Sequence, residues 1–215
     1  MLRKGIIRKL WRGTFMINPK LIPGAPKIII IDAYLKNEYY IGLYTALRYW
    51  KLSDAPQYRY QILTVKRWLS GRRTRIENLS LRFIYINEDA FFGYSRYPYG
   101  GALVNVSDLE KTIIDAVYFL GRYVTIEDLC KALILAKNKI NIEKLIRYLK
   151  RLDRPFINQR LGFLLEKSGM TEYSEEIRRK LKISNRYVFL DPYAHKKEYA
   201  RSPRWRILIN RKLQL

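Results

Sequence analysis

The feature of this sequence that most limits its possible folds is a change of hydrophobic period near Ser107. Before it, segments 58–65 and 79–86 alternate apolar and polar residues, as half-buried β-strands do. After it, apolar residues recur with helical spacing. We expect five helices there, at 109–118, 125–137, 141–151, 154–167 and 172–181. The sequence therefore predicts an α+β fold, a small mixed or antiparallel β-sheet with a five-helix cluster.

Shorter segments complete the predicted organisation. Residues 1–18 are typical of a β-hairpin joined through WRG at 11–13. A cluster of chain breakers follows it, so we place a domain boundary there, with a hairpin and linker at 1–26 and the main domain at 27–215. The main domain opens with helices at 28–35 and 41–52, although the run IIII at 28–31 also suits a strand. Shorter strands are expected at 91–94, 103–106, 187–190 and 205–209.

The chain carries a large excess of positive charge. It has 42 Lys and Arg against 19 Asp and Glu, a net charge of +23. The excess is +13 in residues 1–75, +1 in 76–150 and +9 in 151–215. Positive blocks of this kind bind phosphate backbones and release counterions, so nucleic acid is the expected partner. A thermophilic habitat would explain abundant charge, but not its sign.

Two basic segments are candidate nucleic-acid contacts. The first is the hairpin, whose cations would lie against phosphates as the wing of a winged helix does: Arg3, Lys4, Arg8, Lys9 and Arg12. The second is a turn around Gly71, with Arg67, Arg72, Arg73 and Arg75. The alternatives are an edge hairpin whose cations oppose aggregation, and a solvated loop.

Most enzyme chemistry lacks sequence support. A single cysteine, Cys130, and a single histidine, His195, allow neither an internal disulfide nor a cysteine-based zinc site, and no phosphate-binding glycine loop occurs. The longest run without a charged side chain has eleven residues, 97–107, which is too short for a membrane span. We expect a non-enzymatic cytoplasmic protein without a metal or cofactor.

Two alternative functions stay open at this stage. A metal-dependent nuclease would need clustered carboxylates, and Asp32, Glu110 and Asp115 are the candidates. A structural RNA-binding protein would prefer folded RNA to duplex DNA. For Asp115 an ion pair on the face of Lys111 is the structural alternative, and the SDLE run from Ser107 to Glu110 is typical of a helix capping box.

Four stretches, in this order, resemble the AbiEi-type antitoxins, the transcriptional regulators of type IV toxin–antitoxin (abortive infection) pairs. They are YIGLYTAL at 40–47, VSDLEKTIID at 106–115, RLGFLLE at 160–166 and WRILIN at 205–210. The resemblance spans about 28–210. It marks Ser107, Glu110, Lys111, Asp115, Arg160 and Gly162 as motif positions, and we expect structural roles for them, with Arg160 paired to Asp115 or Glu110.

The resemblance implies a function and a partner. In that family an N-terminal winged helix-turn-helix binds the operon's own promoter, and the C-terminal domain carries antitoxicity against a nucleotidyltransferase-like toxin without a tight complex. Residues 3–18 are similar only to the final wing, with RGTF at 12–15 as its corner. We therefore expect an antitoxin domain whose helix-turn-helix is largely missing, through a misplaced start codon or its loss from the gene, and whose DNA contacts are mainly to phosphates.

Overall fold

The computed structural model describes residues 7–11, 14–17, 28, 31–32, 35, 38–56, 58–76 and 79–211. The chain forms two compact units, and it passes between them more than once. The first, here called the sheet unit, comprises Met1–Ile41 and Gln57–Val106; the second, the helical unit, comprises Gly42–Pro56 and Ser107–Leu215. The predicted boundary at 26/27 lies outside the described residues. Over the described part of the chain, no helix has the length and apolarity that crossing a membrane requires.

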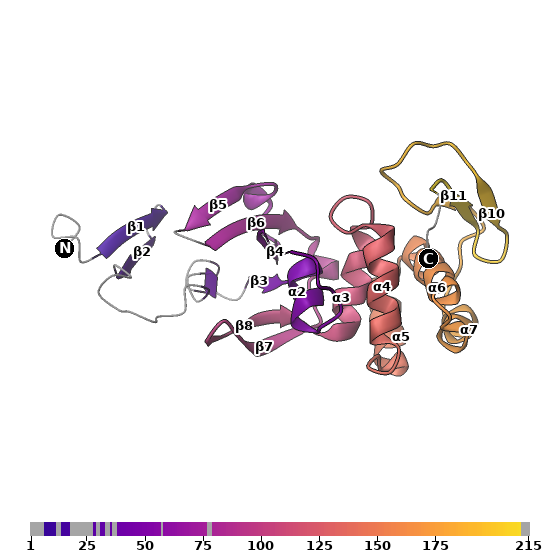
Figure 1. Ribbon diagram of the computed structural model, residues 1–215, viewed down its shortest axis with the longest axis horizontal. Coiled ribbons are helices and arrows are strands. Elements are labelled where there is room, and N and C mark those ends of the chain that lie inside the picture. The colour runs from indigo at the N-terminus through magenta and orange to yellow at the C-terminus, as the bar shows by residue number, and fades with distance from the viewer. Residues whose placement is uncertain are drawn as a thin grey trace. The chain divides into compact units, whose positions relative to one another are not determined.

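The sheet unit is built on a six-stranded mixed sheet in the order β5-β6-β4-β3-β8-β7 (Figure 1). Strands β3 and β4 run antiparallel, as do β5 and β6, whereas β4 and β6 run parallel and β3 and β8 meet in parallel at Ile41 and Val106. The bounds are β3 Tyr39–Ile41, β4 Tyr60–Thr64, β5 Arg73–Ile76, β6 Leu79–Tyr85, β7 Tyr94–Tyr99 and β8 Ala102–Ser107. Two short 3-10 helices, Arg67–Leu69 and Glu88–Ala90, lie between strands.

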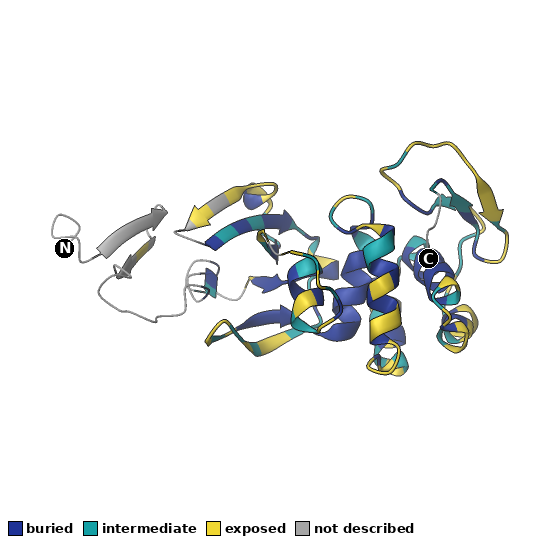
Figure 2. Cartoon of the chain, viewed as in Figure 1, coloured by how far each residue is buried: buried dark blue, intermediate teal, exposed yellow. Residues whose placement is uncertain are grey.

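Burial alternates along β6, as the alternating apolar and polar residues of its sequence predict. Leu79, Leu81 and Phe83 are buried, whereas Ser80 and Arg82 are partly exposed. Figure 2 shows this alternation of dark blue and teal along β6. One face of β6 therefore packs into the core, and the other reaches solvent.

The hairpin of the first residues is present as a pair of strands. Strand β1, Ile7–Trp11, pairs antiparallel with β2, Thr14–Ile17, and the register shifts between Lys9 and Trp11. Of the predicted connection at 11–13, Trp11 is the last residue of β1, and residues 12 and 13 lie outside the described residues.

The helical unit contains six described helices and a three-stranded sheet. The five helices predicted after Ser107 are confirmed, with bounds α3 Leu109–Tyr118, α4 Ile126–Ala136, α5 Ile142–Leu152, α6 Pro155–Lys167 and α7 Thr171–Lys180. The sixth, α2, Leu43–Tyr49, packs on α3. The sheet has the order β10-β11-β9, with β9 Val188–Phe189, β10 Ala200–Ser202 and β11 Ile207–Ile209.

Helix α3 is the centre of this unit. Every residue from Leu109 to Val117 is buried, and α3 contacts α2, α4, α5 and α6. A helix enclosed on all sides must bury its polar side chains too, so each of them needs a partner. This requirement explains the charged contacts described below.

Some expected elements differ from those observed. The strand expected at 91–94 lies instead at Tyr94–Tyr99. It contains Pro98, which is tolerated because β7 is an edge strand, where a residue without an N–H need not complete the ladder. The basic turn at 66–75 contains the 3-10 helix Arg67–Leu69 and most of strand β5.

The lone cysteine gives a first test of this packing. Cys130 on α4 is buried, and burial raises the pKa of its thiol to about 11. The thiolate fraction at about pH 8 should therefore be on the order of a hundredfold below that of an ordinary thiol. We expect a disulfide reagent to label the native protein far more slowly than the urea-unfolded chain. Equal rates would show that α4 does not bury this position.

Candidate functional site

Four arginines gather at one edge of the sheet unit. Strand β5 is the outermost strand of the sheet; Arg73 and Arg75 alternate along it and are exposed. Arg73 is opposite Arg82 of β6, and Arg75 is opposite Ser80, so these side chains share the outer face. We call Arg67, Arg72, Arg73 and Arg75 the basic edge. Arg73 and Arg75 lie on strand β5, Arg72 directly precedes it, and Arg67 lies in the 3-10 helix Arg67–Leu69.

The 3-10 helix before β5 adds aromatic rings to the basic edge. Trp68 is 56% exposed, and the guanidinium carbon of Arg72 lies 5.6 Å from the centre of its ring. Arg67 lies 4.8 Å from the ring centre of Tyr85, and its Nη2 donates to the Tyr85 hydroxyl at 3.1 Å. An exposed indole beside cations provides a stacking surface as well as charge. This surface suits a nucleic acid better than charge alone would.

Two of the five hairpin cations lie among the described residues. Arg8 and Lys9 lie in β1, opposite Met16 and Phe15 of β2, and the structure describes only their backbone. Arg3, Lys4 and Arg12 lie outside the described residues. Their contact with phosphates stays a prediction.

The motif at the start of α3 is a helix cap, but its capping residue differs from the predicted one. Asp108 caps the helix, and its Oδ1 accepts from the backbone N of Lys111 at 3.0 Å. Ser107 is the last residue of β8, and its hydroxyl bonds the Thr112 hydroxyl at 2.7 Å. Both residue types cap helices well, so the sequence alone placed the cap one residue early.

Glu110 does not complete a capping box either. Its Oε1 accepts from the backbone N of Asn141 at 2.9 Å, and Asn141 caps α5. Lys144 on α5 places its Nζ 2.9 Å from Asp108 and 3.1 Å from Glu110. Tyr148, one turn further, donates to Asp108 at 2.7 Å. The acidic start of α3 therefore fixes α5 by charge and by capping.

These contacts shift the pKa values of two side chains on α5. Partial burial opposes the charged form of Lys144, but hydrogen bonds and attraction to Asp108 and Glu110 raise its pKa well above the usual value. Burial and the bond to Asp108 raise the pKa of Tyr148 to about 12. Both groups thus keep their ordinary protonation states at neutral pH. Neither Lys144 nor Tyr148 was found from the sequence, although their spacing of four residues on a helix was a usable signal.

Replacing the capping residue tests this correction. Asp108→Ala removes the cap of α3 together with its contacts to α5, whereas Ser107→Ala leaves both in place. We expect a loss of about 1–2 kcal/mol in the free energy of unfolding for Asp108→Ala from the cap alone. A urea titration should show a smaller loss for Ser107→Ala. The reverse order would restore Ser107 as the cap.

The expected ion pair of Asp115 is present and completely buried. Lys111 Nζ contacts Asp115 Oδ1 one helical turn away, with side-chain exposures of 0% and 2%. Burial lowers the pKa of Lys111, and the charge and hydrogen bond of Asp115 oppose that shift. The pair belongs to the core of the helical unit.

Arg160 does not pair with Asp115 or Glu110. Its Nε donates to the Phe189 carbonyl of β9 at 3.0 Å. Burial lowers its pKa to about 10, an effect that the charge of Asp191 partly offsets. The two carboxylates expected to bind it already have Lys111 and Lys144 as partners. Arg160 therefore fixes the C-terminal sheet to α6.

Gly162 lets the closing motif approach α6. A Cβ at this position would lie 2.1 Å from Cζ3 of Trp205, which is buried and donates from Nε1 to Glu166 at 2.9 Å. The motifs at 160–166 and 205–210 are thus in direct contact.

Gly162→Ala should overpack this contact. We expect it to destabilise the protein by about 1–3 kcal/mol, the usual cost of forcing extra carbon into a full core. Thermal unfolding would measure this loss. Combining it with Trp205→Leu tests the cause, because the smaller side chain should make the added methyl nearly harmless. If Gly162→Ala costs as much in that background, Trp205 is not the reason for the glycine.

The carboxylates considered for a nuclease have other contacts. Asp32 accepts from Tyr39 at 2.8 Å and pairs with Arg96 at 3.0 Å in the sheet unit. Glu110 and Asp115 belong to the helical unit and pair with lysines. Among the residues that the structure describes, no three His, Cys, Asp or Glu side chains are grouped so that they could hold a metal ion.

Comparison with known proteins shows a likeness to solved structures. The fold is similar to that of the RV2827C protein from Mycobacterium tuberculosis, with a TM-score of 0.63 and 18% sequence identity over 96% of this chain and 76% of that chain. No protein-family model matches the sequence, and no curated protein matches it. At this identity the likeness concerns the fold alone.

Proposed function

We propose that this protein is the antitoxin of a type IV toxin–antitoxin pair and a DNA-binding regulator of its own operon. The observation that carries the proposal is the packing of the motif stretches on one another. In the helical unit α2 packs on α3, where Trp50 donates to the Ser107 carbonyl at 2.9 Å. The motif of α6 contacts the closing motif through Gly162 and Trp205. The stretches that carry the family resemblance thus also pack against one another in the folded protein.

The regulator part of the proposal rests on the basic edge. Exposed arginines on an edge strand contact phosphates without sequence preference, so the protein would bind duplex DNA mainly through its backbone. The hairpin cations would add to this surface. Specific readout of bases needs an element in the major groove, whereas the basic edge lies on a 3-10 helix and an edge strand.

A promoter experiment tests the regulator part. The upstream region of the operon drives a reporter gene, with and without this protein, and purified protein is titrated onto the same DNA at several salt concentrations. We expect repression and a steep salt dependence of binding. Repression without DNA binding would contradict the regulator part of the proposal, and so would the absence of both repression and binding. Tighter binding to folded RNA than to the promoter would favour the structural RNA-binding alternative.

The antitoxin part concerns a nucleotidyltransferase-like toxin. The resemblance implies that the C-terminal domain carries antitoxicity and that it acts without forming a tight complex with the toxin. The helical unit would then act on the toxin's target or effect. Growth of toxin-expressing cells measures this part separately from DNA binding.

A further inference from the structure

A cleft beside the C-terminal sheet has no role in the proposed function. It has a volume of about 440 Å³ and is lined by Tyr193, Ala194, His195, Tyr199, Asn210 and Arg211. Small-ligand sites commonly measure about 300–1,000 Å³, so one nucleotide would fit. Tyr193 and Tyr199 are 59% and 53% exposed, so both side chains reach solvent at this cleft.

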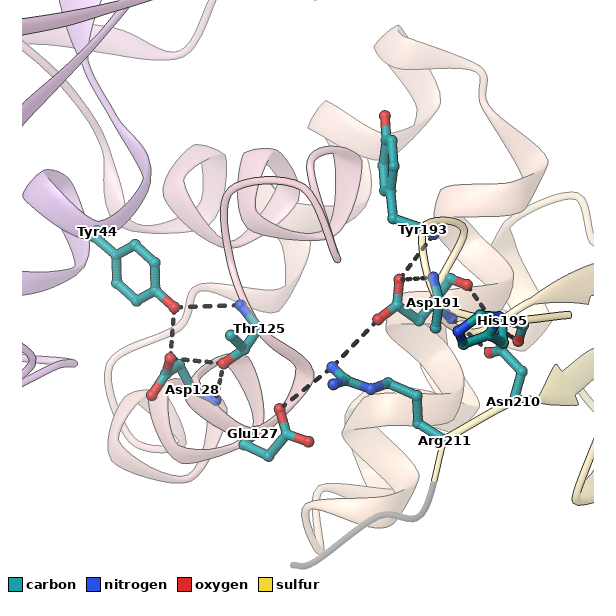
Figure 3. Close-up of polar contacts among 10 residues, drawn as sticks. Tyr44, Thr125, Glu127, Asp128, Asp191, Tyr193, His195, Asn210 and Arg211 are labelled. Carbon is teal, nitrogen blue, oxygen red and sulfur yellow. Dashed lines mark hydrogen bonds and ion pairs between the residues drawn. The ribbon is translucent and has the colours of Figure 1, made fainter. Parts of the chain in front are cut away.

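A network of hydrogen bonds fixes the cleft (Figure 3). The buried Asp191 accepts from the backbone N of Tyr193 at 2.9 Å and of Ala194 at 3.1 Å. Asn210 accepts from the backbone N of Asp191 at 3.0 Å, and its amide donates to the carbonyls of Asp191 and His195 at 2.8 and 3.2 Å. The loop that follows β9 is therefore held by its own Asp191 and by Asn210, the residue after β11, and this frame presents its exposed tyrosines.

The neighbourhood of the cleft is positively charged. Arg211 Nη1 lies 3.3 Å from Asp191 and 4.0 Å from Glu127, yet its side chain stays 42% exposed. Lys196 and Lys197 are exposed on the same loop, and the Lys197 ammonium lies 5.9 Å from the ring centre of Tyr199. Residues 191–211 hold six Lys and Arg and two acids, and of these cations Arg201 and Arg204 pair with Glu198 and Glu175. A polyanion would be attracted to this cleft.

We propose that this cleft binds an unpaired nucleotide of a single-stranded nucleic acid. One or both exposed tyrosines stack on the base, and Arg211 with Lys196 and Lys197 neutralises the flanking phosphates. A duplex keeps its bases inside the stack, so it cannot present a base to a concave site of this size. An acidic peptide would use the lysines, but would leave the two tyrosines without a matching surface. The preference for unpaired strands distinguishes this site from the basic edge.

Fluorescence anisotropy with labelled oligothymidylate and oligouridylate tests the proposal. In the full chain, Tyr193→Ala combined with Tyr199→Ala should weaken binding of single strands at least about tenfold, because stacking contributes about 1–3 kcal/mol per base. Leu135→Ala is the matched control, since Leu135 is a 51% exposed apolar residue on α4 of the same unit. It should bind like the wild type.

Three outcomes would overturn the proposal. The double variant could bind single strands as tightly as the wild type does, or it could lose affinity for single strands and for a promoter duplex equally. A free mononucleotide at high concentration could also fail to displace either oligonucleotide from the wild type. A preference between the two oligonucleotides would decide only whether the strand is DNA or RNA. The site does not depend on the antitoxin proposal, because promoter binding and growth rescue are measured separately.

Discussion

Changing the four arginines of the basic edge to alanine is expected to weaken binding to duplex DNA by about a hundredfold at low salt. Each phosphate contact contributes about 0.9 to the slope of log affinity against log salt, so four lost contacts should flatten that slope by about 3 to 4. The variant is Arg67→Ala, Arg72→Ala, Arg73→Ala and Arg75→Ala together. Because these side chains are exposed, the free energy of unfolding should change little.

A control variant with the same change in net charge shows whether binding depends on the basic edge or on the total charge of the protein. Lys131, Lys139, Arg147 and Lys150 are exposed residues of α4, α5 and the segment between them. Their replacement by alanine should leave most of the affinity and the salt slope intact. If both quadruple variants lose affinity equally, binding depends on net charge, and the basic edge is not an interface.

The second large effect is expected from the buried ion pair of α3. Asp115→Ala leaves the Lys111 ammonium in the core without its counter-charge, which should cost about 3–5 kcal/mol in the free energy of unfolding. Lys111→Met combined with Asp115→Leu removes both charges, and it should recover most of the loss because apolar residues can replace a buried pair. Urea unfolding of the wild type and the variants measures both effects.

A surface pair provides the control. Arg179 and Glu176 form a pair on the surface of α7, and solvent screens such pairs so that they contribute little to stability. Glu176→Ala should therefore have a small effect. A loss for Asp115→Ala no greater than for Glu176→Ala would mean that Lys111 finds water or another partner, and that α3 is not the closed centre of the unit.

Local signals in the sequence predicted the helices well. Thr125 and Asn141 both cap helices through their side chains, and the chain after each has helical spacing. The same local rules placed the cap of α3 at Ser107 rather than Asp108. They could not decide between two adjacent good caps, because the deciding fact is that Ser107 belongs to β8.

Contacts between distant residues were not predictable in the same way. The pairing of β5 with β6 turned an expected basic loop into an edge strand, and this pairing depends on register rather than composition. Arg160 was assigned a carboxylate partner, whereas it bonds a carbonyl of β9, 29 residues away. The bonds between Asp191 and Asn210 likewise join residues 19 apart. A single sequence contains little information about such pairs.

Growth of cells under toxin expression tests the central proposal most directly. The cells express the neighbouring gene, where it encodes a nucleotidyltransferase-like protein, and this chain is supplied from a second plasmid. We expect the wild type to restore growth. The quadruple arginine variant should also restore growth while losing repression of the promoter, because we propose that the helical unit carries antitoxicity and the basic edge lies in the sheet unit. Failure of the wild type to restore growth, with the toxin active and this chain soluble, would contradict the antitoxin function.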